Sequence, residues 1–110
     1  MFKIKVNDSE AVLDDKAVEK LNRLSRPWTL QILILLDKDK PMRFNSIKKV
    51  LSGICSRSLS ERLDEMETDG IIKRVVTDDS PPKVEYFLTD KGQELKEIAI
   101  EILNWVRKWE

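Results

Sequence analysis

The sequence of 110 residues lacks histidine and has only one cysteine and three glycines. It therefore has no imidazole for acid–base catalysis, no histidine ligand for zinc and no cysteine–histidine dyad. A lone cysteine forms no disulfide within the chain, which is typical of the reducing cytoplasm. The sequence also has no glycine-rich phosphate loop, metal-ligand cluster or ordered nucleophile–base pair. This composition argues against an enzyme and against a bound cofactor or metal.

Long apolar runs are also missing. The longest extends from Ile32 to Leu36, far below the roughly 20 residues of a membrane-spanning helix. The first residues contain no apolar signal segment. We therefore expect a cytoplasmic protein without a membrane partner. The length suits a single domain over residues 1–110.

Charged residues are abundant but balanced, because 20 basic side chains offset 20 acidic ones. Between Pro41 and Arg62, five basic residues stand against a single acid, whereas Leu63 to Asp69 carries four acids and no base. A basic patch next to an acidic one can bind a polyanion. The alternative is that both are simply solvated helix faces.

The first quarter of the chain predicts a strand and a helix. Alternation of apolar residues with lysines indicates a short strand over residues 2–6. A helix is expected over residues 8–25, capped by either Asn7 or Asp14. Its apolar face would comprise Leu13, Ala17, Leu21 and Leu24.

Two further helices are predicted before the middle of the chain. Residues 27–37 are apolar nearly all round, which indicates a central buried helix with Pro27 in its first turn. A shorter helix is expected over residues 44–51. Its inward side chains would be Ile47, Val50 and Leu51.

A fourth helix is predicted over residues 56–68, after a tight turn at Gly53 and before a C-cap at Gly70. The spacing of its apolar residues places three of them on one face, namely Leu59, Leu63 and Met66.

The apolar period then changes to two, which predicts a hairpin over residues 71–88 with a loop at residues 77–83. Thr89 and Asp90 form an N-cap pair for a last helix over residues 90–108. This helix carries one apolar stripe, made of Leu95, Ile98, Ala99, Ile102, Trp105, Val106 and Trp109.

A short helix, a glycine turn, a second helix and a hairpin follow one another as in a winged helix-turn-helix. The predicted fold class is therefore mainly α with a small β-hairpin wing (α+β), with additional N- and C-terminal helices. The helix over residues 56–68 can lie in the major groove of DNA, which admits one α-helix. Its candidate contacts to bases or phosphates are Arg57, Ser58, Ser60, Glu61 and Arg62.

From Leu21 onward the chain resembles the HxlR-type winged-helix transcriptional regulators of bacteria and archaea, relatives of the MarR-like group. The resemblance rests on five ordered stretches, at residues 28–33, 43–47, 53–63, 67–72 and 81–92. Its most specific parts are the wing sequence Pro-Pro-Lys-Val-Glu-Tyr and the Leu-Thr-x-x-Gly start of the last helix.

The resemblance implies a homodimer that regulates transcription from a near-palindromic promoter site. It assigns major-groove and phosphate contacts to Arg43, Ser56, Arg57 and Ser60, and a backbone or minor-groove contact to Lys83 in the wing. Many members carry a sensing cysteine near the start of the first helix, where this chain has Asp15.

The family pairs its terminal helices across the dimer. This assigns to the interface Leu95, Ile98, Ile102, Trp105 and Trp109. The residue types favour the same assignment, because burying two tryptophans in an interface contributes several kcal/mol to the free energy of association. The alternative is that the tryptophans fold back on their own domain.

Cys55 stands where the family usually has a serine or threonine that caps the recognition helix. A thiol at a helix N-terminus can have a lowered pKa and react readily. One hypothesis is therefore a redox sensor, whose oxidation would release DNA. The alternative is a small residue tolerated in the cap.

The main alternative function is a winged-helix protein-interaction module without sequence-specific DNA binding. Zero net charge favours it, as do Asp78 and Asp79 in the wing loop, which would repel phosphate. A steep fall of DNA affinity with salt would argue against it. No residue pattern marks a small-molecule effector.

Overall fold

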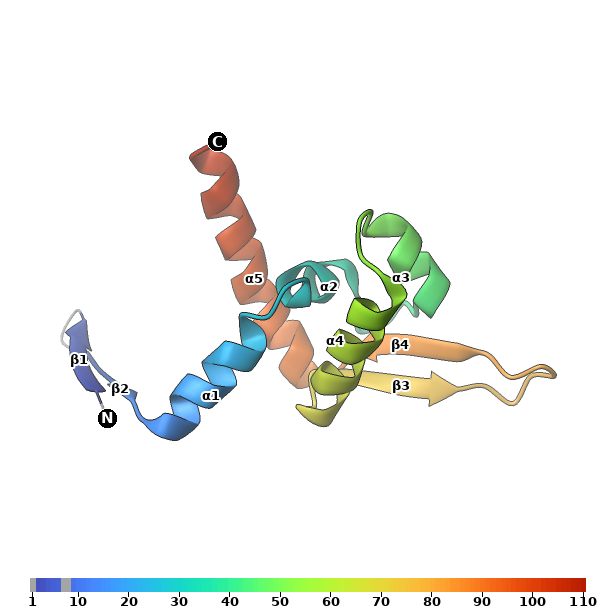
Figure 1. Ribbon diagram of the computed structural model, residues 1–110, viewed down its shortest axis with the longest axis horizontal. Helices are drawn as coiled ribbons and strands as arrows, with labels where there is room; N and C mark the ends of the chain where they lie inside the picture. Colours follow the sequence, from blue (N-terminus) through green and yellow to red (C-terminus); the bar gives the residue numbers. More distant parts are fainter. Residues whose placement is uncertain (1, 7–8) are drawn as a thin grey trace.

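The computed structural model describes residues 2–6 and 9–110. Two strands, β1 (Phe2–Val6) and β2 (Ser9–Leu13), form an antiparallel hairpin at the N-terminal end (Figure 1). The helices that follow are α1 (Asp15–Leu24), α2 (Thr29–Leu35), α3 (Phe44–Val50) and α4 (Ser56–Thr68). An antiparallel wing then precedes the last helix, and its elements are β3 (Ile72–Val76), β4 (Val84–Leu88) and α5 (Asp90–Lys108). This order confirms the predicted winged helix-turn-helix.

The core is built around α2, as the sequence predicts. Ile32, Leu33 and Leu36 have no exposed surface, and the inner half of α5 packs on this helix. The helix begins at Thr29, so the prediction that Pro27 lies in its first turn is wrong. Trp28 adopts a left-handed backbone conformation, with φ of 76°, and breaks the helix at that point.

The recognition helix and the wing are fixed to this core. Leu59, Leu63 and Met66 of α4 are buried, which confirms the predicted inner face. The wing gains a third, short partner because Met42 bridges to Tyr86, with N–O distances of 3.1 and 2.8 Å. Beyond this bridge the wing projects freely from the body (Figure 1).

The predicted helix over residues 8–25 is wrong in its first half. Ser9–Leu13 forms β2, and the helix starts at Asp15 because the Asp14 carboxylate accepts a hydrogen bond from the Ala17 N–H at 2.8 Å. The other candidate cap, Asn7, lies outside the described residues, as does residue 8. Pairing with β1 therefore outweighs the helical spacing of the apolar residues.

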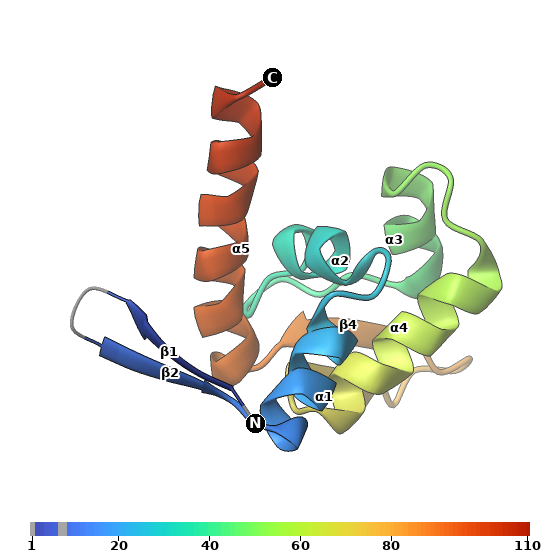
Figure 2. The ribbon, with the colours of Figure 1, turned by 60° about the vertical axis from the view of Figure 1, so that its left-hand side comes forward.

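α1 lies at the edge of the body rather than in the core (Figure 2). It has no buried residue, and Leu21 on its predicted inner face is half exposed. Ion pairs hold this segment instead, since Arg23 contacts Asp69 at 2.9 Å and Arg26 contacts Glu65 at 2.7 Å. α3 is also peripheral, which exposes Val50 and contradicts its predicted inward position, whereas Ile47 is buried.

One joint connects α4, the wing and α5. The Thr89 side chain caps α5 by accepting from the Gly92 N–H at 3.1 Å. The Thr89 N–H donates to the Ile71 carbonyl oxygen at 3.0 Å, and the single hydroxyl hydrogen faces the carbonyl oxygens of Gly70 and Ile71, of which that of Gly70 is nearer. Gly92 lies so close to the Ile71 carbonyl that a Cβ atom there would overlap it. The absence of a side chain at residue 92 thus allows α5 to pack against the start of β3.

Replacing Gly92 with alanine should lower the free energy of unfolding by about 1–3 kcal/mol, although alanine is the better helix former. The reason is the overlap with backbone atoms of Ile71, which cannot rotate away. Urea denaturation followed by circular dichroism measures the change. Asn104→Ala, on the exposed outer half of the same helix, is the matched control. A loss at Gly92 no larger than in this control would contradict the role of the joint.

Candidate nucleic-acid interface

α3, the turn after it and α4 form the helix-turn-helix. Gly53 adopts a φ of 100°, a conformation that favours glycine, and so lets the chain reverse within a few residues. Ile54 is buried directly after it and fixes the turn to the core. α4 then leaves the turn with its apolar face inward, so its opposite face is open to solvent (Figure 2).

The exposed face of α4 contains most of the predicted contacts. Ser56, Arg57, Ser60 and Glu61 are exposed together, and the Arg57 side chain is 88% accessible. Arg57 Nε donates to Glu61 Oε1 at 3.0 Å, one helical turn away. An ion pair in water contributes little to stability. The guanidinium is therefore free to exchange Glu61 for another acceptor.

Arg62 is not part of this face. Only 12% of its side chain is exposed, and its Nη2 atom donates to Glu65 at 2.9 Å. Arg26 also forms an ion pair with Glu65, so two arginines share one carboxylate. Nε of Arg62 is buried without a partner in the described part of the chain. These contacts tie α4 to the turn before α2 and leave Arg62 poorly placed to reach a ligand.

Arg43 is exposed at the N-cap position of α3, next to the Met42–Tyr86 bridge. It provides a cation where α3 and the base of the wing meet. Lys48 and Lys49, also exposed, extend the basic character along α3.

In the wing, Lys83 is exposed at the end of the loop. Two hydrogen bonds close this loop at its base, from Thr77 N–H to the Lys83 carbonyl at 2.8 Å and from Lys83 N–H to Thr77 Oγ1 at 3.0 Å. The Thr77 hydroxyl also donates to Asp79 at 3.0 Å, which draws this carboxylate back towards the loop base. Both Asp78 and Asp79 are exposed.

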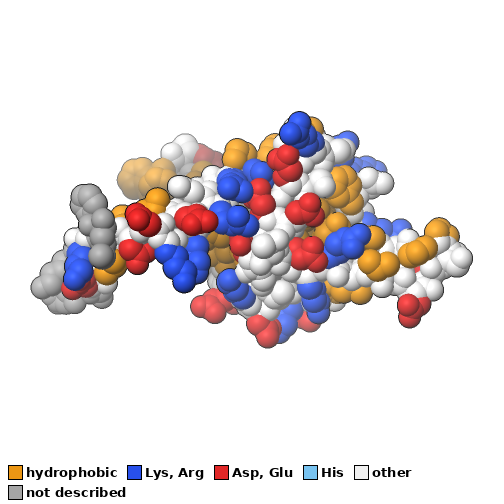
Figure 3. Space-filling view, turned by 60° about the horizontal axis from the view of Figure 1, so that its bottom comes forward, with side chains coloured by type: hydrophobic (Ala, Val, Ile, Leu, Met, Phe, Trp, Pro, Cys, Tyr) orange, Lys and Arg blue, Asp and Glu red, His pale blue; other side chains and the backbone are white. Residues whose placement is uncertain are grey.

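Two further cations of the wing, Lys73 and Arg74, are exposed on β3 and were not among the predicted contacts. Two adjacent basic residues in a strand that leads into the wing loop could have been recognised in the sequence as candidate contacts. Figure 3 shows acidic and basic side chains interspersed over one face of the molecule, in keeping with the zero net charge.

Cys55 is the N-cap of α4 and is exposed. Its sulfur accepts the Ser58 N–H at 3.4 Å and lies 3.2 Å from the Ser58 hydroxyl. These hydrogen bonds, with that of the hydroxyl first, hold the pKa of the thiol below its ordinary value. The cap therefore favours the thiolate. The redox-sensing role itself stays a prediction.

Alkylation of Cys55 by iodoacetamide should show a pH midpoint below that of the same protein unfolded in urea. A lowered pKa populates the reactive thiolate at lower pH, and Ser58→Ala should raise the midpoint by removing the hydroxyl. Ser60→Ala, a neighbour without contact to the sulfur, is the control. Equal midpoints in the folded and unfolded protein would contradict the stabilised thiolate.

Among the described residues, no group of three or more acidic or cysteine side chains is placed to hold a metal ion. No helix in the same part of the chain is long and apolar enough to cross a membrane.

The helix-turn-helix, the wing and α5 are also the parts that a known family matches. The family model described as HxlR-like helix-turn-helix matches residues 23–110. The chain belongs to the HxlR-like helix-turn-helix family. This confirms the resemblance seen in the sequence. The matched range begins near the end of α1, so the β1–β2 hairpin precedes it.

Individual relatives agree with the family. YvaP of Bacillus subtilis, an HTH-type transcriptional regulator, is 40% identical over 95 residues, which cover 86% of this chain and 84% of YvaP. The reduced form of the transcriptional regulator YodB from B. subtilis has 33% identity and a TM-score of 0.72, covering 86% of this chain and 91% of its own. These relatives are transcriptional regulators and not enzymes, and this HxlR-family protein is a transcriptional regulator of the same type.

A third structure extends the comparison of the fold. The protein described as a possible HxlR family transcriptional factor from Thermoplasma volcanium has a TM-score of 0.85 and 23% identity. The match covers 98% of this chain and 95% of that chain. It therefore reaches into the N-terminal hairpin, which the family model does not include.

Proposed function

We propose that this regulator binds double-stranded DNA sequence-specifically as a homodimer on a near-palindromic promoter site. Each protomer places α4 in a major groove and the wing loop, residues 77–83, on the backbone or in the minor groove. The observation that carries the proposal is the two-sided character of α4. Its inner face is fixed to the core, while its outer face presents exposed polar and charged side chains near the N-terminal end.

The chemistry of this outer face suits bases. Arginine can donate in a bidentate manner to guanine O6 and N7, and glutamate can accept from cytosine N4. Arg57 and Glu61 are one turn apart and orient each other, so both can face the groove from a fixed helix. Ser56 and Ser60 flank them and can donate to phosphate or base edges.

Arg43 and Lys83 are assigned to phosphates on either side of α4. Both are exposed, and both belong to segments held by backbone hydrogen bonds at the base of the wing. Arg62 is assigned a positioning role instead, because its side chain is covered and paired with Glu65.

The homodimer is assigned to the outer part of α5. Leu95 is half-buried, but Ile98, Ile102, Trp105 and Trp109 are largely exposed. An exposed apolar stripe of this size on a soluble protein marks an interaction surface. It also argues against the alternative that the tryptophans fold back on their own protomer. A two-fold dimer would present its recognition helices about 34 Å apart, one turn of DNA.

Selection of bound duplexes from a random library, followed by titration at several salt concentrations, tests the proposal. An enriched inverted repeat and a steep fall of affinity with salt are expected, since phosphate contacts release counterions. The proposal would be overturned if the protein is dimeric but enriches no DNA sequence and binds DNA weakly and independently of salt. That result would favour the interaction module, to which the exposed Asp78 in the wing and the zero net charge point.

Arg57→Ala should weaken binding to the selected site by about 1–3 kcal/mol and relax the base preference at one position of each half-site. Arg107→Ala, an exposed arginine on α5, is the matched control for loss of one positive charge. Fluorescence anisotropy with site variants measures both effects. An equal loss of DNA affinity in the two variants would show that Arg57 makes no specific contact.

Lys83→Ala should weaken binding to all sequences alike and reduce the slope of log affinity against log salt by about 1. The expected cause is the loss of a single phosphate contact by the wing. Lys16→Ala, on the exposed surface of α1, serves as the control. An unchanged slope would remove the wing loop from the interface.

A further inference from the structure

The β1–β2 hairpin has an apolar face that its own protomer leaves open to solvent. Ile4 pairs with Ala11, and Leu13 lies on the same side of the sheet, because residues two apart in a strand share a face. Lys3 and its partner Val12 lie on the other side. Ile4 is 41% exposed, and Ala11 is exposed as well.

A hairpin of this kind needs another surface to pack against, since a two-stranded sheet is only marginally stable in water. Within the described part of its own protomer, it packs mainly on α1, the helix that follows it. Figure 1 shows the hairpin at one end of the longest dimension of the molecule, 56 Å, and the wing at the other end. The hairpin therefore projects away from the body and from the face proposed to bind DNA.

The outer half of α5 carries a second apolar surface beside the stripe assigned to helix pairing. At 100° per residue, Val106 and Leu103 follow the stripe on one side, whereas Glu94 and Glu101 border it on the other. Ala99, on the same side as Val106 and Leu103, is buried where α5 packs on α2, but these two residues lie beyond that contact and are exposed. The apolar arc spans about 160°, more than the seam that one partner helix covers. We call Leu103 and Val106 the second flank.

The stripe supplies only part of the apolar surface that a stable dimer needs. With Trp105 64% and Trp109 70% exposed, and about 150–250 Å² buried by one tryptophan, these two residues contribute roughly 200–330 Å² per protomer. Ile98 and Ile102 are about half exposed and add roughly 60–110 Å². A standard interface buries about 800 Å² per partner, of which about 65% is apolar in homodimers. Further apolar contact is therefore required.

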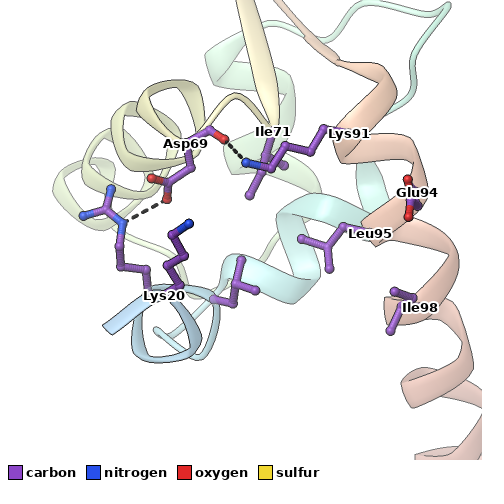
Figure 4. Close-up of a pocket in the computed structure, with 9 residues that line it drawn as sticks. Lys20, Asp69, Ile71, Lys91, Glu94, Leu95 and Ile98 are labelled. Carbon is purple, nitrogen blue, oxygen red and sulfur yellow. Dashed lines mark hydrogen bonds and ion pairs between the residues drawn. The ribbon is translucent and has the colours of Figure 1, made fainter. Parts of the chain in front are cut away.

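Antiparallel pairing of α5 would bring the hairpin and the second flank together. α1 adjoins the inner half of α5, where Leu24 of α1 and Leu95 and Ile98 of α5 line a pocket of about 370 Å³ between the two helices (Figure 4). Figures 1 and 2 both show the hairpin level with this inner half and far from the C-terminal end of α5. In an antiparallel pair, the inner half of one helix lies alongside the outer half of the other. The hairpin then stands next to the outer half of the partner's helix.

We propose that the β1–β2 hairpin is an arm that lays its apolar face on the second flank of α5 in a second copy of this chain. The proposal rests on the homodimer proposed above and adds a further contact to it. The arm precedes the residues matched by the family model, so this contact is additional to the pairing of terminal helices. Two-fold symmetry gives the dimer two such contacts.

Contact through the face of the hairpin is favoured over pairing along its edge. β1 contains Lys3 and Lys5, and lysines in an exposed edge strand discourage the addition of another strand. Lys3 Nζ lies 3.7 Å from Glu10 Oε1 on the polar face, and both side chains are more than half exposed. This face can stay in water while the apolar face turns towards α5.

Sedimentation equilibrium of the full chain tests the arm with a matched pair of substitutions. Ile4→Asp should weaken dimerisation tenfold or more, because it places a charge in an apolar contact. Val12→Asp, on the opposite face and with the same exposed fraction of 41%, should change it less than threefold. Both substitutions carry the same risk of loosening the hairpin, so the difference between them reports on the face. Equal effects in the two variants, or no effect in either, would overturn the proposal.

Cross-linking between two single-cysteine proteins locates the contact. Cys55→Ser removes the native thiol from both, and one protein then carries Ile4→Cys and the other Leu103→Cys. After subunit exchange, a short bismaleimide should join one chain of each kind into a covalent dimer. Val12→Cys in place of Ile4→Cys is the control and should give at least tenfold less.

The same experiment separates the arm from the homodimer. Equal yields with Ile4→Cys and Val12→Cys, or no covalent product from a mixture that sediments as a dimer, would overturn the arm and leave the proposed homodimer intact. A wild-type chain that stays monomeric at all concentrations, by contrast, would overturn both.

Discussion

The packing of the first turn of α5 against the carbonyl of Ile71 holds the functional parts together. Ile71 follows the end of α4 and precedes β3, while Thr89 follows β4 and caps α5. Hydrogen bonds from Thr89 to the carbonyl oxygens of Gly70 and Ile71 thus join α4, the wing and α5. The contact is between backbone atoms, with no Cβ at Gly92 to separate them, so α5 approaches the chain at Ile71 more closely than any other residue at position 92 would allow.

Ion pairs reconcile the zero net charge of the chain with the proposed binding of DNA. Two of the acids near the end of α4 are neutralised by ion pairs within the protein. Asp69 pairs with Arg23, and Glu65 pairs with Arg26 and Arg62. Asp64 and Glu67 of α4 stay exposed, and Arg57 stands at the opposite, N-terminal end of the same helix. The charge that a phosphate meets first is therefore local, and the composition of the entire chain is a poor guide to it.

Elements governed by local signals could be predicted from the sequence. The N-cap at Thr89 and the periodicity of α4 and α5 were sufficient to place these elements, although the C-cap of α4 is Asp69 and the predicted Gly70 follows it. β2 was missed because Ser9–Leu13 becomes a strand only by pairing with β1, a contact that apolar spacing does not reveal. At 100° per residue Arg57 and Arg62 lie about 140° apart on a helix, so their different environments were predictable. The pair of Arg62 with Glu65, three residues further on, is equally local, whereas the pair of Arg26 with Glu65 could not be predicted because these two residues are distant in sequence.

α5 has two halves with different constraints. Its inner half is immobilised on α2, where Ala99 is buried and Lys96 Nζ donates to the Leu36 carbonyl at 2.6 Å. Its outer half extends past the core with its apolar stripe exposed, which the stability of one protomer does not require. In the proposed dimer, α5 is anchored on α2 at one end and paired with the partner at the other, so it determines how far apart the two copies of α4 lie. The spacing of the half-sites that such a dimer can bind is then a property of α5 and of the joint at Ile71, not of the recognition helix.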